Sequence, residues 1–91
     1  MKQRDKLSSP RKRVRINIEA INALLNALAS SKEGMKPYKL WRETALIMSH
    51  YTQLIEHLEY CLKMGLIEVK EQGKHKKYFI TEKGQRVLGL L

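Results

Sequence analysis

Residues 47–81 read IMSHYTQLIEHLEYCLKMGLIEVKEQGKHKKYFIT, and this stretch decides the fold. Apolar residues recur three or four positions apart across residues 49–64, which predicts an amphipathic helix with Ser49 as its N-cap. Gly65 stands where a left-handed C-cap is favoured, so we expect the helix to end there. Two alternating runs follow on either side of basic residues 72–76, and they predict a β-hairpin. The helix residues expected to pack inward are Tyr51, Leu54, Leu58, Cys61 and Leu62.

Two helices are expected before this stretch and one after it. In the first, apolar residues recur at helical spacing and residues 30–34 end the pattern. The second begins at Pro37, since proline loses no needed hydrogen bond in a first turn. Thr81 is placed to cap a short final helix. The apolar residues assigned to the first helix are Ile18, Ile21, Leu24, Leu25 and Leu28, and those assigned to the second are Tyr38, Leu40, Trp41, Ala45 and Leu46.

This order of elements predicts a winged helix-turn-helix, a mostly α fold with a small β-hairpin. It has three helices, a two-stranded wing and a short C-terminal helix. Ninety-one residues are enough for one domain. We expect residues 1–13 to form a basic flexible arm, because they carry many charges and little to bury, and residues 14–91 to form the winged-helix domain.

Positive charge is concentrated near the N-terminus. The chain has a formal net charge of +9, and residues 1–15 hold seven Lys or Arg against one acid, Asp5. A polyanionic partner is therefore expected, with nucleic acid preferred over a membrane surface. The alternative is that the arm only keeps the protein in solution.

Several other classes of protein are disfavoured. Cys61 is the single cysteine, so no intrachain disulfide can form and a reducing, cytoplasmic location is expected. No secretory signal or membrane-spanning run is apparent. Neither metal ligands nor catalytic residues occur at a productive spacing, so we expect no metal, no cofactor and no enzymatic activity.

A helix with polar outward side chains can enter the major groove of DNA. The side chains expected to face bases from helix 49–64 are Thr52, Gln53, Glu56 and His57. For each of them, an ordinary solvated helix face is the competing interpretation. Because residues 49–64 carry a net charge of −1, phosphate contacts must come from other parts of the chain. The residues expected to bind phosphate are Arg11, Lys12, Arg13 and Arg15 of the arm, Lys36, Lys39 and Arg42 of the second helix, Ser49 at the start of the third, and Lys74, His75, Lys76 and Lys77 of wing residues 72–77.

Phe79 departs from the alternating pattern. If Tyr78 and Ile80 point inward, Phe79 points away from the core on its strand. It is then either covered locally, which we favour, or part of a contact between subunits.

The segment from Tyr51 to Leu91 resembles the small archaeal winged helix-turn-helix DNA-binding domains. The matching features are Leu54, Leu58, Met64-Gly65-Leu66-Ile67, the Gly73 turn, Tyr78-Phe79-Ile80-Thr81 and Glu82-Lys83-Gly84. This resemblance covers a little under half of the chain, and the first two helices match in length and order only. It implies a winged-helix fold, binding to double-stranded DNA and a homodimer.

The leading interpretation is a DNA-binding protein, either a transcriptional regulator or a less selective architectural factor. The main alternative is a winged-helix adaptor that binds another protein and no DNA, which the acidic third helix favours. A weaker alternative is RNA binding, for which exposed stacking aromatic residues would be expected.

Overall fold

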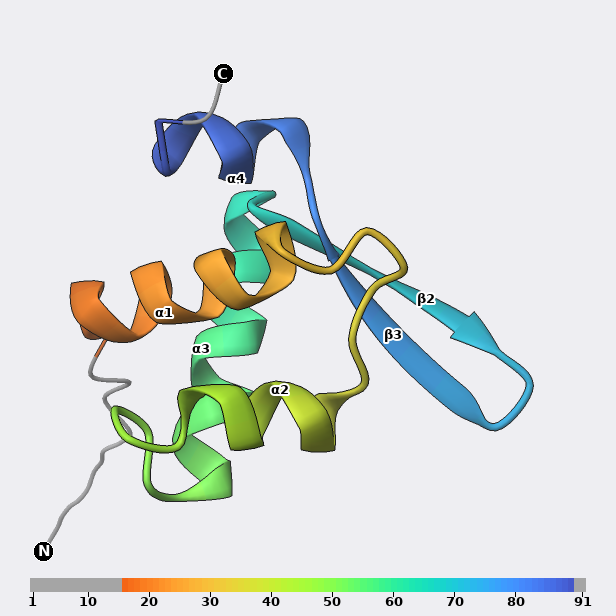
Figure 1. Ribbon diagram of the computed structural model, residues 1–91, viewed down its shortest axis with the longest axis horizontal. Helices are drawn as coiled ribbons and strands as arrows, with labels where there is room; N and C mark the ends of the chain where they lie inside the picture. Colours follow the sequence, from red (N-terminus) through yellow and green to blue (C-terminus); the bar gives the residue numbers. More distant parts are fainter. Residues whose placement is uncertain (1–15, 90–91) are drawn as a thin grey trace, which may run out of the picture.

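The computed structural model describes residues 16–89. Three helices are followed by an antiparallel hairpin and a short C-terminal helix (Figure 1), as the sequence predicts. The elements are α1 (Ile18–Ala29), α2 (Pro37–Thr44), α3 (Tyr51–Met64), β2 (Ile67–Gln72), β3 (His75–Ile80) and α4 (Glu82–Val87). The expected arm at residues 1–13 and its boundary lie outside the described residues.

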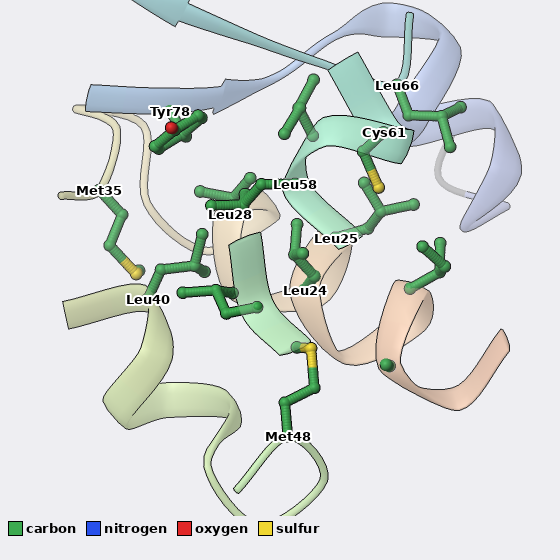
Figure 2. Packing of buried hydrophobic residues seen from close by; sticks show 14 residues of the cluster. Leu24, Leu25, Leu28, Met35, Leu40, Met48, Leu58, Cys61, Leu66 and Tyr78 are labelled. Carbon is green, nitrogen blue, oxygen red and sulfur yellow. The ribbon is translucent and has the colours of Figure 1, made fainter. Parts of the chain in front are cut away.

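The core forms where α1 and α3 meet beneath the hairpin. Leu24, Leu25 and Leu28 of α1 pack among Leu58 and Cys61 of α3 (Figure 2), and all five are buried. Burying a leucine side chain contributes about 1.5–3 kcal/mol. The helical spacing in the sequence therefore identified the faces on which the domain is built. Met35, Leu40, Met48, Leu54, Leu66, Ile67 and Tyr78 complete most of the cluster.

Both ends of α3 are set by local hydrogen bonds. At its C-terminus Gly65 adopts φ 76°, and the amide of Leu66 donates to the carbonyl oxygen of Cys61 at 2.9 Å. This is the left-handed stop expected from the glycine. At its N-terminus the cap is His50 rather than Ser49, and the His50 amide donates to Oε1 of Gln53 at 3.1 Å. The prediction for the start of α3 was therefore wrong by one residue.

The hairpin is longer and tighter than predicted. β2 and β3 pair from Ile67↔Ile80 to Gln72↔His75, which leaves only Gly73 and Lys74 in the turn. Gly73 has φ 62°, a conformation that glycine adopts without a steric penalty. His75, Lys76 and Lys77, expected in a loop, therefore belong to β3.

Phe79 is covered locally, as favoured from the sequence. Its ring lies on the backbone of Gly34, where an added Cβ would approach Cζ of Phe79 to 2.6 Å. On the same face of the hairpin, Nζ of Lys70 lies 5.1 Å from the ring centroid. Gly34 is therefore required for close packing, and its φ of 83° also favours glycine.

The N-terminus of α4 also follows the sequence. The hydroxyl of Thr81 accepts a hydrogen bond from the Gly84 amide at 3.2 Å and donates one to the Gly65 carbonyl oxygen. One side chain thus joins the end of α3 to the start of α4.

Within residues 16–89, no helix is both long enough and apolar enough to span a bilayer.

The buried thiol of Cys61 provides a probe of the fold. Burial raises its pKa to about 11, so at pH 8 only about one folded molecule in a thousand carries the reactive thiolate. We expect Cys61 to react with a disulfide reagent at pH 8 only when the domain opens, and fully in concentrated urea. Rapid labelling of the folded protein without denaturant would contradict this packing.

Candidate nucleic-acid interface

A cationic groove lies between the start of α2, the start of α3 and the tip of the hairpin. We call it the wing groove, and its volume is about 380 Å³. Figure 1 shows α2 beginning on the side toward which the hairpin extends. The groove is lined by Lys36, Pro37, Tyr38, Tyr51, Lys74, His75 and Lys76. These residues come from three elements, and none of them is acidic.

A single backbone pairing holds the start of α2 beside the hairpin. The Met35 amide donates to the Tyr78 carbonyl oxygen at 3.0 Å, and the Tyr78 amide donates to the Met35 carbonyl oxygen at 2.9 Å. Lys36 follows as the N-cap of α2, and Pro37 occupies its first turn as predicted. That turn holds no acidic residue and its cap makes no side-chain hydrogen bond, so the positive end of the helix dipole is not neutralised locally.

Trp41 positions the two tyrosines of the groove. Its indole N–H donates to the Met48 carbonyl oxygen at 3.1 Å, which fixes the ring over the turn between α2 and α3. The Tyr38 ring packs against the Trp41 ring with centroids 6.1 Å apart. The Tyr51 ring meets the Trp41 ring edge-on, with centroids 5.6 Å apart. Tyr38 is 63% exposed and Tyr51 40% exposed. The expectation that both point into the core is therefore wrong, and both phenols border the groove instead.

The groove cations are not neutralised by ion pairs with other described residues. Across residues 16–89, the ion pair present joins Arg86 to Glu82 on α4.

Burial raises the pKa of the Tyr78 phenol, and nearby Tyr51 and Glu59 raise it further. Tyr78 therefore stays neutral at physiological pH and adds no negative charge behind the groove.

The outward face of α3 carries part of the predicted base-reading set. Thr52 and Glu56 are exposed, as expected. Gln53 is half-buried, and its Oε1 accepts the hydrogen bond that caps the helix, so only part of its amide remains available. Glu59 is also exposed, which makes the middle of this face acidic.

The prediction that His57 faces bases is wrong. His57 is only 4% exposed, and its Nε2 accepts a hydrogen bond from the Asn17 amide at 3.1 Å. Its Nδ1 lies 2.7 Å from the Gln53 carbonyl oxygen, so Nδ1 carries the proton and donates it there. The histidine joins α3 to the N-cap of α1 instead of meeting a ligand.

The other predicted phosphate ligands among residues 16–89 do not line the wing groove. Lys39 and Arg42 are exposed on α2, and the Arg42 guanidinium lies 6.0 Å from the Tyr38 ring centroid. Ser49 is exposed before α3, whereas Lys77 is half-buried and pairs with Lys70 across the strands. Arg11, Lys12, Arg13 and Arg15 lie outside the described residues. Of the predicted residues, the structure brings Lys36, Lys74, His75 and Lys76 together in the groove.

The sequence-based prediction included Lys36 among the possible phosphate contacts but omitted three other groove residues from the site, Pro37, Tyr38 and Tyr51. Nothing in the spacing distinguishes the two tyrosines from core residues. No group of three potential metal ligands occurs among residues 16–89.

Replacing His57 separates its structural role from base reading. We expect His57→Leu to lower the free energy of unfolding by about 1–3 kcal/mol, because the Asn17 amide loses its acceptor. Urea denaturation measures this loss, and Thr52→Ala on the exposed face should stay within about 0.5 kcal/mol of the parent. Unchanged stability together with altered preference among DNA sequences would restore the base-reading role.

No protein-family model and no curated protein matches the chain. Solved structures that are similar to it include the following two. The crystal structure of SSV1 F-93 aligns with a TM-score of 0.61 and 17% identity, covering 75% of this chain and 77% of that one. AF1382 from Archaeoglobus fulgidus aligns with a TM-score of 0.64 and 14% identity, covering 81% and 80%. These likenesses confirm the winged-helix fold expected from the sequence.

Proposed function

We propose that the protein binds double-stranded DNA, with the sugar-phosphate backbone held in the wing groove and the start of α3 directed into the major groove. One observation carries the proposal. Lys36, Lys74, His75 and Lys76 converge from separate elements on one concave surface that has no acidic lining residue. An anionic polymer is the ligand that such a surface fits.

The chemistry of the groove suits phosphate oxygens. Lysine ammonium groups and tyrosine hydroxyls donate hydrogen bonds to phosphate, and so do amides at a helix N-terminus. Because Lys74 and Lys76 lie at the end of a narrow hairpin, they can follow the DNA backbone beyond the edge of the domain. These contacts are independent of base sequence and supply most of the affinity.

Reading of bases is expected to be limited. Thr52, near the N-terminus of α3, is the exposed side chain best suited to contact a base edge. Glu56 accepts a hydrogen bond from cytosine if it reaches one, whereas Glu59 repels nearby phosphates. This balance favours a less selective architectural factor over a highly specific regulator.

We also propose that the protein acts as a homodimer, as the family resemblance implies, and that it binds without catalysing a reaction or carrying a cofactor. Two wing grooves on one dimer engage two backbone segments. The second engagement is then intramolecular, which raises the overall affinity.

One specific observation favours the adaptor alternative. Leu46 is fully exposed in the turn between α2 and α3, and Glu56 and Glu59 are exposed on α3. An exposed apolar side chain, together with exposed acids on the following helix, suits a basic protein partner. The wing groove has no role in that alternative, so its cations distinguish the two functions.

Reversing charge at the tip of the hairpin tests the proposal. We expect Lys74→Glu combined with Lys76→Glu to weaken binding to a random-sequence duplex at least about tenfold. The slope of log K against log salt should become shallower by about 2, because two phosphate contacts are lost. Fluorescence anisotropy at several salt concentrations measures both changes.

The control is Lys32→Glu combined with Arg86→Glu, which changes the net charge equally at positions that do not line the groove. Loss of the exposed Arg86–Glu82 pair should cost little stability. If both double variants bind equally weakly, net charge alone decides binding. If both bind as the parent does, the wing groove is not the DNA site.

A further inference from the structure

The outer face of α1 carries no positive charge and a single negative one. Lys and Arg make up 18 of the 91 residues, yet none lies within the twelve residues of α1. Its single charged residue, Glu19, is in the first turn, where an acid interacts favourably with the helix dipole. Depletion of charged side chains is typical of the centre of a protein interface.

Three exposed residues of α1, which lie beside the charged Glu19, form an uncharged ridge. Ile18, Asn22 and Asn26 are exposed and lie four positions apart, so they follow one row along the helix. Ser30, the C-cap, continues the row. Rows with this spacing pack into the grooves of a second helix in the commonest class of helix crossing.

An apolar groove lies between α1, the end of α3 and α4, next to the ridge. We call it the α1–α4 groove, and its volume is about 370 Å³. Ile18 is 76% exposed on its edge, and Met64 and Val87 are also exposed there. Ile21 and Leu66 form a buried floor, and Lys83 is the charged residue of the lining. Three large apolar side chains are thus exposed together next to the ridge.

We propose that a second copy of this chain covers the ridge and the α1–α4 groove, with the two α1 helices packed across a two-fold axis. This inference rests on the proposed homodimer and names its surface. Charge favours this location for a contact between copies: two chains of +9 repel each other, and the helix without Lys or Arg is where they approach at least cost.

The asparagines favour a second copy over an unrelated partner. An amide both donates and accepts hydrogen bonds, so the same residue from two copies can pair across a two-fold axis. Asn26 donates from Nδ2 to the Asn22 carbonyl oxygen at 2.9 Å. Within residues 16–89, no hydrogen bond uses Oδ1 of Asn26 or the side-chain amide of Asn22.

The location of this surface leaves the wing groove free. The first turns of α1 and α4 lie away from the tip of the hairpin (Figure 1). The residues lining the two grooves do not overlap. A dimer formed here therefore keeps both wing grooves open.

Sedimentation velocity without DNA tests the inference. At about 100 µM the parent chain should sediment with about twice the 10.7 kDa of one chain. We expect Ile18→Glu and Asn22→Arg each to weaken self-association at least about tenfold, because each buries an unpaired charge. The matched control Leu46→Glu introduces the same charge at another exposed apolar site and should remain dimeric.

The results of these experiments test the dimer surface separately from dimerisation itself and from DNA binding. Two variants are used so that a folding defect in one, detected by circular dichroism, leaves the other to decide. A parent dimer that neither variant weakens contradicts this surface and leaves the homodimer in place. A parent that stays monomeric at this concentration overturns both the dimer and its surface. DNA binding is measured separately and is not decided by either result.

Discussion

The two backbone hydrogen bonds between Met35 and Tyr78 determine how the candidate site is built. They join the segment before α2 to the strand that carries the hairpin, although 43 positions separate them in sequence. Because Met35 is buried and Tyr78 lies in the core, this pairing is anchored by apolar packing as well as by hydrogen bonds. Lys36 and Pro37 must then lie beside the wing, and Trp41 brings Tyr38 and Tyr51 to the same opening. Without the pairing, α2 would be free to begin elsewhere and the wing groove would lose one wall.

Much of the fold follows from local signals in the sequence. Helical spacing identified α1 and α3, Gly65 identified the end of α3, and Pro37 and Thr81 identified two helix starts, because each signal acts over a few residues. The hairpin was recognised, but its turn was predicted too long: basic residues are common in loops, and here three of them extend β3. The site was predicted less well. His57 and Thr52 both fall on the polar side of α3, and only the contact with Asn17 shows that His57 is buried. Tyr38 and Tyr51 have the composition of core residues, and their exposure depends on where Trp41 packs.

The distribution of charge divides the described surface into three functional regions. The wing groove concentrates cations, the outward face of α3 carries Glu56 and Glu59, and the outer face of α1 has no Lys or Arg. In the function we propose, the acids of α3 repel phosphates, and the wing groove beside it provides most of the affinity for DNA. The acids then restrict how closely the middle of α3 approaches the duplex, which favours contact through its first turn. This division makes a mildly acidic third helix compatible with the proposed binding to DNA.

The most direct test of the central claim is a map of backbone amide shifts when a short random-sequence duplex is added to ¹⁵N-labelled protein at low salt. The account predicts that the largest changes fall on Lys36, Tyr38, Tyr51 and residues 73–76, with Thr52 following. Amides in the middle of α1 and in α4 should change little. Shifts confined to α1 and α4, or a spectrum that does not change at all, would contradict the assignment of the wing groove as the DNA site.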